Sequence, residues 1–456
     1  MIVMKFGGSS VESATAIARV ASIVKAREDR RPVVVVSAMG KTTNRLLAIA
    51  KAAAEGEQGE ALRLLGELKE YHRTEALQIV REQDRAELAQ LLDEHFTELS
   101  LMVAEIAQVE EFSPRMVDAV SSMGERLSSR IVTLGFRHAG MDTVHVDSRS
   151  VLITDTRHTQ AAPLFPRTYA RMQEVVAPLA AKQVVVMGGF IGSTQNGVTT
   201  TLGRGGSDYS ASIIGAGIGA EEIQIWTDVD GMLTCDPRIV PGGYRIKTIS
   251  FAEAAELAYF GAKVLHPATV LPAVEKNIPV LVLNSRNPEI SGTRIVKETV
   301  PCRNVIKSIA CKTGITVVKI QSLRMLMAHG FLHRIFEVFD RFHTPVDMVT
   351  TSEVSVSLTI DNDKNLDEIR DELGRIAEVG VETNRAIVCV VGENVRGTPG
   401  IAARIFRSLA GINVLMVSQG ASQLNFSFVI DATELRPAVE SLHAEFFSTL
   451  DPEVFA

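Results

Sequence analysis

Residues 202–210 read LGRGGSDYS, and this short run contains three glycines, an arginine, two serines and an aspartate. Glycine loses more conformational freedom on folding than other residues and so destabilises strands and helix interiors. We therefore do not expect the run to lie within either element. Ser207 and Asp208 suit the cap of a helix that begins here, but capping does not account for Arg204. A guanidinium group can bind a carboxylate through two parallel hydrogen bonds. The run therefore indicates a site that binds a carboxylate.

A second glycine pair occurs in KFGGSS, residues 5–10, after an apolar run and before a helical pattern. Adjacent glycines let the backbone approach a ligand, and the N-terminus of the following helix directs N–H groups toward it. Lys5 adds a positive charge at the end of the predicted strand. These features are typical of a phosphate-binding loop, and the structural alternative is a tight turn with a surface lysine.

Further polar residues follow another apolar run in WTDVDGMLTCDPR, residues 226–238. This segment places Thr227, Asp228 and Arg238 in a polar turn after a strand, and AKVLHP then adds Lys263.

Two other glycine patterns resemble nucleotide-binding motifs only in part. MGKTT, residues 39–43, contains the second half of a Walker A loop, but Val35 stands where the first glycine is required. GAGIGA, residues 215–220, follows SASII rather than a strand. Its small residues are therefore expected to pack a helix against a sheet, and a dinucleotide-dependent oxidoreductase is disfavoured.

Predicted strands and helices alternate along the first 300 residues, and these elements must position the residues described above. Apolar runs such as IVMKF, PVVVVSA, QVVVMGGF and IPVLVLN have no polar face, as in strands of a buried parallel sheet. Helical patterns lie between them, and this alternation predicts a three-layer α/β domain with a mostly parallel central sheet. Residues 51–112 are rich in strong helix formers and predict a helical hairpin inserted into the domain.

After about residue 300 a repeat with an offset of 70 residues begins. GFLHRIFEVFDRF starts at Gly330 and GIAARIFRSLAGI at Gly400, while SLTID ends at Asp361 and SFVID at Asp431. Two copies suit a pair of ferredoxin-like βαββαβ modules. We therefore expect one domain at 1–299 and a second region at 300–456, with modules at about 315–385 and at about 386–456 plus 305–314.

Composition narrows the class of protein. The chain has 456 residues and a formal net charge of −7, which gives no reason to expect a nucleic-acid partner. No apolar run approaches the ~18 residues of a membrane span, and the N-terminus does not resemble a signal peptide. The scattered residues Cys235, Cys302, Cys311 and Cys389 predict free thiols in a reducing compartment. We expect a cytoplasmic protein.

Five motifs, in this order, resemble the signatures of the aspartate kinases of the amino-acid kinase family. They are KFGGSSV, SSMGERLSS, GGFIGSTQNGVTTTLGRGGSDYSA, WTDVDGMLTCDPR and FAEAAELAYFGAKVLHPAT. The repeat after residue 300 resembles the tandem ACT domains of that family, so the match covers nearly the whole chain. The resemblance implies that ATP, with Mg²⁺ as cofactor, phosphorylates the β-carboxylate of L-aspartate to 4-phospho-L-aspartate. This reaction is the first step toward lysine, threonine and methionine.

The resemblance also implies roles for individual residues. Lys5 would bridge the phosphates, Asp208 would organise Lys5 and the metal-bound phosphates, Arg204 would hold the α-carboxylate of aspartate, and Glu125 would accept its ammonium group. The implied ATP-binding set is Lys5, Gly7, Gly8, Ser9, Thr227, Asp228, Leu233, Arg238 and Lys263, and the implied aspartate-binding set is Ser37, Thr43, Glu125, Arg204 and Ser207. The sequence departs from the family pattern at Ser9, where threonine is usual, and at Leu233, where a tyrosine is common.

In the regulatory half, MLMAHGFLHRIFEVF and VDMVTTSEVSVSL resemble the effector-binding module of lysine-sensitive aspartate kinases. Lysine is the effector that the resemblance implies first, although Ala328 replaces a serine of some lysine-inhibited relatives. We expect Ile335, Phe336 and Phe339 to form an apolar stripe in the core. Phe331 either belongs to this stripe or is an effector residue. ACT pairs associate between subunits, which implies a homodimer. The implied effector residues are Met325, Ala328, Phe331, Leu332, Asp347 and Ser352.

Two other functions remain as alternatives. A kinase of glutamate or acetylglutamate would share KFGG, but is not expected to carry SSMGERLSS together with the repeat. An amino-acid sensor with an inactive kinase domain is disfavoured because Lys5, Glu125, Arg204 and Asp208 are all present. A bifunctional enzyme with a dehydrogenase module is not expected for a chain that ends at Ala456. The sequence does not determine which amino acid inhibits, or whether dimers pair into a larger assembly.

Overall fold

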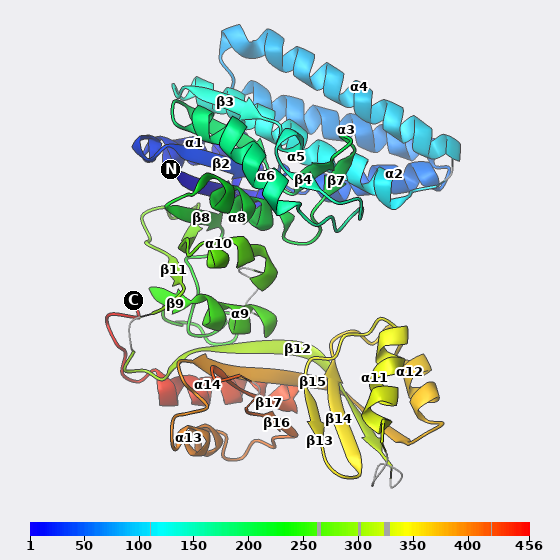
Figure 1. Ribbon diagram of the computed structural model, residues 1–456, viewed down its shortest axis with the longest axis vertical. Coiled ribbons are helices and arrows are strands. Elements are labelled where there is room, and N and C mark those ends of the chain that lie inside the picture. Colours follow the sequence, from blue (N-terminus) through cyan, green and yellow to red (C-terminus); the bar gives the residue numbers. More distant parts are fainter. Residues whose placement is uncertain (110, 262–265, 300–301, 323–328, 421) are drawn as a thin grey trace. The chain divides into compact units, whose positions relative to one another are not determined.

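The computed structural model describes residues 1–109, 111–261, 266–299, 302–322, 329–420 and 422–456 (Figure 1). The chain divides into two compact units. The first comprises Met1–Gly231 and Val264–Glu298, and the second comprises Met232–Lys263 and Thr299–Ala456. The second unit thus includes a segment that precedes the boundary expected near residue 300.

The first unit is built on a mostly parallel sheet with the strand order β3-β5-β2-β1-β8-β10-β11. Neighbouring strands run parallel, except that β10 and β11 are antiparallel. Strands β1, β2 and β5 are buried almost throughout, which explains why apolar and polar residues do not alternate in their sequences. The strands are Thr143–Val146 (β3), Val184–Gly188 (β5), Pro32–Val36 (β2), Ile2–Phe6 (β1), Glu222–Thr227 (β8), Val280–Asn284 (β10) and Thr293–Val296 (β11).

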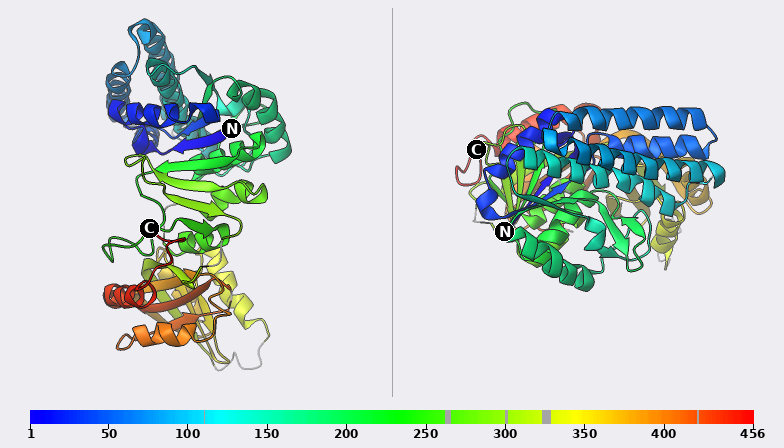
Figure 2. Two further views of the ribbon diagram at one scale, coloured as in Figure 1. Left: turned by 90° about the vertical axis from the view of Figure 1, so that its left-hand side faces the viewer. Right: turned by 90° about the horizontal axis from the view of Figure 1, so that it is seen from above.

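Helices lie on both sides of this sheet, and Figure 2 shows the two layers with the strands between them. One core joins Ile2, Met4 and Phe6 of β1 to the first five helices. These are Ala14–Lys25 (α1), Thr42–Ala54 (α2), Gln58–Leu77 (α3), Arg85–Val109 (α4) and Pro114–His138 (α5). The remaining helices are Phe165–Arg171 (α6), Ala177–Ala180 (α7), Gly206–Ile218 (α8) and Leu271–Glu275 (α10). The predicted three-layer α/β fold is confirmed.

Helix α8 lies on the opposite side of the sheet from that core. A Cβ atom at Gly215 would lie 2.6 Å from Ile223 Cδ1 and 3.7 Å from Val3 Cγ2. A Cβ atom at Gly217 would lie 3.0 Å from Met172 Cγ. The glycines of GAGIGA therefore let α8 pack closely against its neighbours, as the sequence indicated.

A small sheet connects the large sheet to α8. Its strands are Ile153–Thr154 (β4), Ile191–Thr194 (β6) and Thr199–Thr201 (β7), in the order β4-β6-β7. The chain leaves β7 directly into the glycine-rich segment 202–205, after which α8 begins. This arrangement places the segment that holds Arg204 between a strand end and a helix N-terminus.

The second unit contains an antiparallel sheet with the strand order β13-β14-β12-β15-β17-β16. Its long strands, β12 and β15, pair along most of their length. The strands are Ile306–Gln321 (β12), Val349–Thr351 (β13), Ser355–Ile360 (β14), Glu378–Gly392 (β15), Met416–Ser418 (β16) and Asn425–Asp431 (β17). The unit also holds Thr248–Ser250 (β9) and the helices Phe251–Tyr259 (α9), Phe331–Arg341 (α11), Leu366–Leu373 (α12), Ile401–Ser408 (α13) and Leu435–Phe446 (α14).

The predicted repeat is present in this unit. Gly330 and Gly400 precede α11 and α13 with φ angles of 76° and 81°, which favour glycine. The strands β14 and β17, which contain SLTI and SFVID, occupy equivalent places. Two ferredoxin-like modules therefore share the long strands β12 and β15.

The apolar face of α11 differs from the expectation at one position. Phe331, Ile335 and Phe339 are buried in one core, whereas Phe336 is 40% exposed. The prediction that Phe336 belongs to the core stripe was wrong, because one residue along a helix turns the side chain by about 100° from the face of Ile335.

Candidate active site

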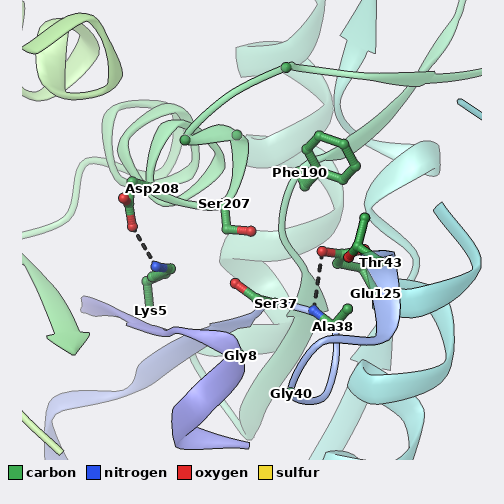
Figure 3. A pocket seen from close by; sticks show the side chains of 13 residues that line it. Lys5, Gly8, Ser37, Ala38, Gly40, Thr43, Glu125, Phe190, Ser207 and Asp208 are labelled. Carbon is green, nitrogen blue, oxygen red and sulfur yellow. Dashed lines mark hydrogen bonds and ion pairs between the residues drawn. The ribbon is translucent and has the colours of Figure 1, made fainter. Parts of the chain in front are cut away.

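Strand alternation determines where the Lys5 side chain points. Ile2, Met4 and Phe6 belong to the core formed with α1–α5, so Val3 and Lys5 face the α8 side of the sheet. Asp208 lies in the first turn of α8, and its Oδ1 atom is 2.6 Å from Lys5 Nζ (Figure 3). Both side chains are mostly buried, with exposed fractions of 11% and 17%. The structure therefore joins two predicted catalytic residues that are far apart in the sequence.

The glycine pair after β1 lies against the loop that follows β2. A Cβ atom at Gly8 would lie 2.8 Å from the carbonyl oxygen of Gly40 and 2.9 Å from that of Ala38. Gly40 N donates a hydrogen bond to Gly8 O at 3.0 Å. Only glycine fits at position 8, because any side chain would collide with backbone atoms.

A cavity of about 320 Å³ opens beside the ion pair of Lys5 and Asp208 (Figure 3). Residues from the predicted ATP-binding and aspartate-binding sets line it together with Asp208, which brings the phosphate-binding loop next to the aspartate-binding residues. Its lining consists of Lys5, Gly8, Ser37, Ala38, Gly40, Thr43, Glu125, Phe190, Gly203, Gly205, Gly206, Ser207 and Asp208.

Glu125 contributes a buried carboxyl group to this cavity. Its Oε1 atom accepts a hydrogen bond from Ala38 N at 3.1 Å, while Oε2 has no hydrogen-bond partner among the described residues. Burial raises the pKa of Glu125 to about 8, although the Ala38 hydrogen bond acts in the opposite direction. A cation that enters the cavity would satisfy the free oxygen and favour the ionised form.

Arg204 itself lies outside the cavity lining. Gly203 and Gly205, with φ angles of 76° and 71°, line the cavity on either side of it. Arg204 is exposed and makes no hydrogen bond or ion pair to any residue that the structure describes. Its predicted contact with a substrate carboxylate therefore stays a prediction, and it requires the side chain to turn inward.

Phe190 lines the cavity although the sequence analysis did not select it. Its φ angle is +66°, a conformation that is uncommon for a bulky residue. Phe190 N donates to Ser210 Oγ at 2.9 Å, and a Cβ atom at Gly206 would lie 2.6 Å from the Phe190 ring. The available signal was an aromatic residue beside two glycines directly after a buried strand.

Asp118 is a second residue that the sequence analysis missed. This carboxylate is fully buried on α5, seven residues before Glu125, and it accepts hydrogen bonds from Thr159 N at 3.0 Å and from Thr201 Oγ1 at 2.5 Å. His158 Nδ1 lies 2.7 Å from its Oδ2 atom. Thr201 ends β7, so Asp118 anchors the segment that leads into residues 202–205.

The residues predicted for ATP are only partly brought together. Gly7 N donates to Trp226 O at 3.3 Å, so the glycine loop adjoins Thr227 and Asp228 at the end of β8. Ser9 is exposed and does not line the cavity. Leu233 and Arg238 belong to the second unit, where Arg238 pairs with Asp236 at 2.6 Å. Lys263 lies outside the described residues.

In the second unit, Asp347 already has a cationic partner. Lys312 Nζ lies 2.8 Å from Asp347 Oδ1 and 2.8 Å from Asp361 Oδ2, and Tyr259 Oη donates to Asp347 Oδ1 at 3.2 Å. Burial lowers the pKa of Lys312, but the hydrogen bonds to Asp347 and Asp361 outweigh it, and the net shift is upward. An effector that binds Asp347 must share or displace Lys312.

The other predicted effector residues differ in accessibility. Phe331 is 6% exposed and belongs to the module core, as the packing alternative predicts, and its role in effector binding stays a prediction. Leu332 and Ser352 are exposed, and Ser352 Oγ lies 2.7 Å from Ser355 Oγ. Met325 and Ala328 lie outside the described residues.

Comparison with known proteins places these features in a family. Residues 1–284 match the model of the amino acid kinase family, and residues 388–446 match that of an ACT domain. The chain is 39% identical to aspartokinase 2, chloroplastic, of Arabidopsis thaliana, over 99% of this chain and 85% of that one. It is 36% identical to lysine-sensitive aspartokinase 3 of Escherichia coli, over 98% and 99% of the two chains.

The chain belongs to the amino acid kinase family, among the aspartokinases.

Solved structures of this family share the fold over nearly the whole length. The chain is 35% identical to E. coli aspartokinase III in complex with lysine and aspartate in the T-state, with a TM-score of 0.85 and 98% and 99% of the two chains covered. For the same protein in complex with aspartate and ADP in the R-state, the identity is 34%, the TM-score 0.82 and the coverage 98% and 100%. The expected kinase domain with ACT modules is therefore confirmed.

Two further findings concern metals and membranes. The described residues include no group of three or more His, Cys, Asp or Glu side chains suited to hold a metal ion. Mg²⁺ is commonly held by one or two carboxylates together with substrate phosphates and water, so Asp208 at the cavity edge fits an ion that arrives with a nucleotide. None of the described helices has the length and apolarity needed to cross a membrane.

Proposed function

We propose that this chain transfers the γ-phosphoryl group of ATP to the β-carboxylate of L-aspartate and forms 4-phospho-L-aspartate. One observation carries the proposal: the ion pair of Lys5 and Asp208 borders the same cavity as a buried oxygen of Glu125 that has no partner in the described part of the chain. The cavity thus offers a lysine for a phosphoryl group and a carboxyl group that can ionise to bind an ammonium group. The relatives named aspartokinase, and the solved relative in complex with aspartate and ADP, support this assignment.

The chemistry requires two anions to meet. The β-carboxylate of aspartate, with a pKa near ~3.9, is already ionised at neutral pH, so no general base is needed. Two unit charges about 4 Å apart repel each other by about 4 kcal/mol at an effective dielectric constant near 20. Lys5, together with the N–H groups at the glycine loop and at the start of α8, offsets this repulsion and stabilises the transferring group.

We assign the substrate contacts by position in the cavity. Glu125 binds the ammonium group, and the hydroxyl groups of Ser37, Thr43 and Ser207 are placed to contact the carboxylates. Arg204 turns from the surface to bind the α-carboxylate. Asp208 keeps Lys5 in place and faces the phosphates.

Mg²⁺ is the divalent ion that we propose accompanies ATP. When bound, it neutralises charge on the phosphates. Asp208 is the residue of this cavity that would face it, because Glu125 is buried and is assigned to the ammonium group. Thr227 and Asp228, beside the glycine loop, would contact the nucleotide, and we keep Leu233, Arg238 and Lys263 as predicted nucleotide residues.

For regulation, we propose inhibition by an end-product amino acid, with lysine as the first candidate, and a homodimer formed through the ACT modules. A relative named lysine-sensitive and a solved relative in complex with lysine support the choice of effector. We also propose that residues 1–299 act as the catalytic domain and residues 300–456 as the regulatory region. The product would supply the pathway that leads to lysine, threonine and methionine.

A hydroxylamine trapping assay tests the proposed reaction. The full chain is incubated with Mg-ATP and either L-aspartate, L-glutamate or N-acetyl-L-glutamate, and the acyl phosphate is measured as its hydroxamate. We expect a signal with aspartate, which lysine reduces. A signal with either glutamate compound and none with aspartate would identify a sister kinase, and no signal with any acid would support a sensor. Lys5→Ala serves as the inactive control.

A further inference from the structure

A second cavity in the first unit has a volume of about 250 Å³, and three arginines border it. Arg126 and Arg130 project from α5, one helical turn apart, and Arg149 comes from the turn after β3 (Thr143–Val146). Among the described residues, none lines both this cavity and the cavity of Lys5 and Asp208. The reaction proposed above therefore leaves this basic cavity without a role.

The three arginines differ in how their charge is compensated. Arg126 binds both carboxylate oxygens of Glu98 at 2.7 Å, and Arg149 binds Asp147 at 2.7 Å. Arg130 makes no hydrogen bond or ion pair to any residue within the described part of the chain. Arg130 is exposed, so its guanidinium group, with five N–H donors, is available at the cavity to a ligand from solution.

Two histidines border the same cavity in their neutral form. Burial lowers the pKa of His145 to about 4. Asp147 opposes this shift, whereas Arg130 and Arg149 act in the same direction as burial. Burial and then Arg126 lower the pKa of His95 to about 3. Ser129 Oγ donates to Glu125 O at 2.7 Å and so accepts from His145 Nε2–H at 3.0 Å, which leaves Nδ1 without a proton. Neither ring therefore adds charge to the cavity, and the positive charge at its border comes from the arginines.

We propose that this cavity binds a small phosphate-type oxyanion, with Arg130 as its principal ligand. A guanidinium group matches the geometry of phosphate oxygens through paired hydrogen bonds. The volume lies below the ~300–1,000 Å³ of pockets for drug-sized ligands, which favours a small ion or the phosphoryl end of a small phosphomonoester. Helix α5 would then carry two binding functions, with Glu125 at the substrate cavity and Arg130 at the anion cavity.

The test uses the full chain at pH 7.5 with inorganic phosphate, glycerol 3-phosphate or malonate. Binding is followed by calorimetry and by the NMR signals of the His145 ring, which His145→Gln identifies. Arg130→Gln is compared with Arg115→Gln, a matched control because Arg115 is exposed on the same helix and has no partner among the described residues. We expect phosphate to shift the His145 signals in the unsubstituted chain and in Arg115→Gln, with about tenfold or greater loss of affinity in Arg130→Gln.

The outcomes are distinguishable. Tighter binding of inorganic phosphate than of the ester supports free phosphate as the ligand, and the reverse supports a phosphomonoester. Malonate that binds as tightly as phosphate would overturn the assignment of the ligand class. Equal phosphate affinity in Arg130→Gln, or binding that Lys5→Ala abolishes and Arg130→Gln preserves, would place the anion in the substrate cavity and overturn the proposal.

Discussion

Replacing Glu125 with glutamine is expected to change both the binding of aspartate and its dependence on pH. The Glu125 carboxyl is buried, one of its oxygens has no partner among the described residues, and burial raises its pKa to about 8. At pH 7 the free enzyme therefore holds Glu125 mostly protonated. A substrate ammonium group needs the ionised form, so aspartate binding should release a proton.

The size of the effect follows from the pKa and the expected contact. At pH 7, one unit below the pKa, ionising Glu125 reduces the binding free energy by about 1.4 kcal/mol. An ammonium group about 2.8 Å from the carboxylate gains about 6 kcal/mol at an effective dielectric constant of 20. Desolvation removes much of this, and charged hydrogen bonds contribute a net ~2–3 kcal/mol. Glu125→Gln should therefore raise the KM for aspartate about 30- to 150-fold above pH 8.

Initial rates at saturating Mg-ATP, measured from pH 6 to pH 9, test this reasoning. In the unsubstituted enzyme kcat/KM for aspartate should rise about tenfold per pH unit up to about pH 8, and in Glu125→Gln this slope should disappear. Calorimetry in two buffers with different ionisation enthalpies should detect about 0.9 protons released at pH 7. Glu105→Gln, an exposed change on α4, is the control. A flat profile in the unsubstituted enzyme, or an unchanged slope in Glu125→Gln, would refute the role of Glu125.

The same pKa predicts a stability effect of opposite sign. The folded chain keeps the Glu125 proton up to about pH 8, whereas the unfolded chain loses it near the ordinary value of 4.5. Folding stability is therefore lost as the pH rises from 4.5 to about 8, by about 1.4 kcal/mol per pH unit in that window. Because glutamine cannot ionise, Glu125→Gln should raise the Tm of the free enzyme at pH 8 and change it little at pH 4. Equal Tm values at pH 8 would contradict the buried, raised pKa.

Four further substitutions probe the other parts of the site. Lys5→Ala should lower kcat about a thousandfold with an unchanged circular dichroism spectrum, since it removes the charge beside the phosphates; a rate within tenfold of normal would exclude this role. Arg204→Ala should raise the KM for aspartate about 10- to 100-fold and leave that for ATP unchanged, and equal shifts would argue against an α-carboxylate contact. Gly8→Ala should lower stability by about 1–3 kcal/mol, because the new Cβ meets the carbonyl groups of residues 38 and 40; an unaltered Tm and KM for ATP would contradict the close contact. Lys312→Met removes the partner of Asp347 and should lower the lysine concentration that gives half-inhibition, whereas an unchanged curve would count against Asp347 as an effector residue.

Much of the fold was predictable because it depends on local patterns. The buried runs PVVVV and VVVMG became neighbouring parallel strands, and the repeat at an offset of 70 became α11 and α13 with left-handed glycines before each. The motif order identified the family. Phe336 was misjudged because apolarity alone does not reveal which side of a helix faces the core.

The candidate site was predictable as a set of residues but not as an arrangement. The sequence could indicate that Lys5, Glu125 and Asp208 act together, yet their contacts depend on how β1, α5 and α8 pack. The motifs indicated neither the positive φ angle of Phe190 nor the ion pair of Asp347 with Lys312. Neither property belongs to a residue alone, because each arises from elements that are distant in the sequence.

The sequence by itself determined the α/β class, the repeat, the family and the residue types available for phosphoryl transfer, since periodicity and motif spacing are local. Only the tertiary structure decided that Lys5 faces α8 and meets Asp208 and that Arg204 lies at the surface. It also decided that Glu125 has a raised pKa and one oxygen without a partner among the residues that the structure describes. The physical reason is that desolvation and ion pairing depend on which atoms surround a charge, and those atoms come from every part of the folded unit.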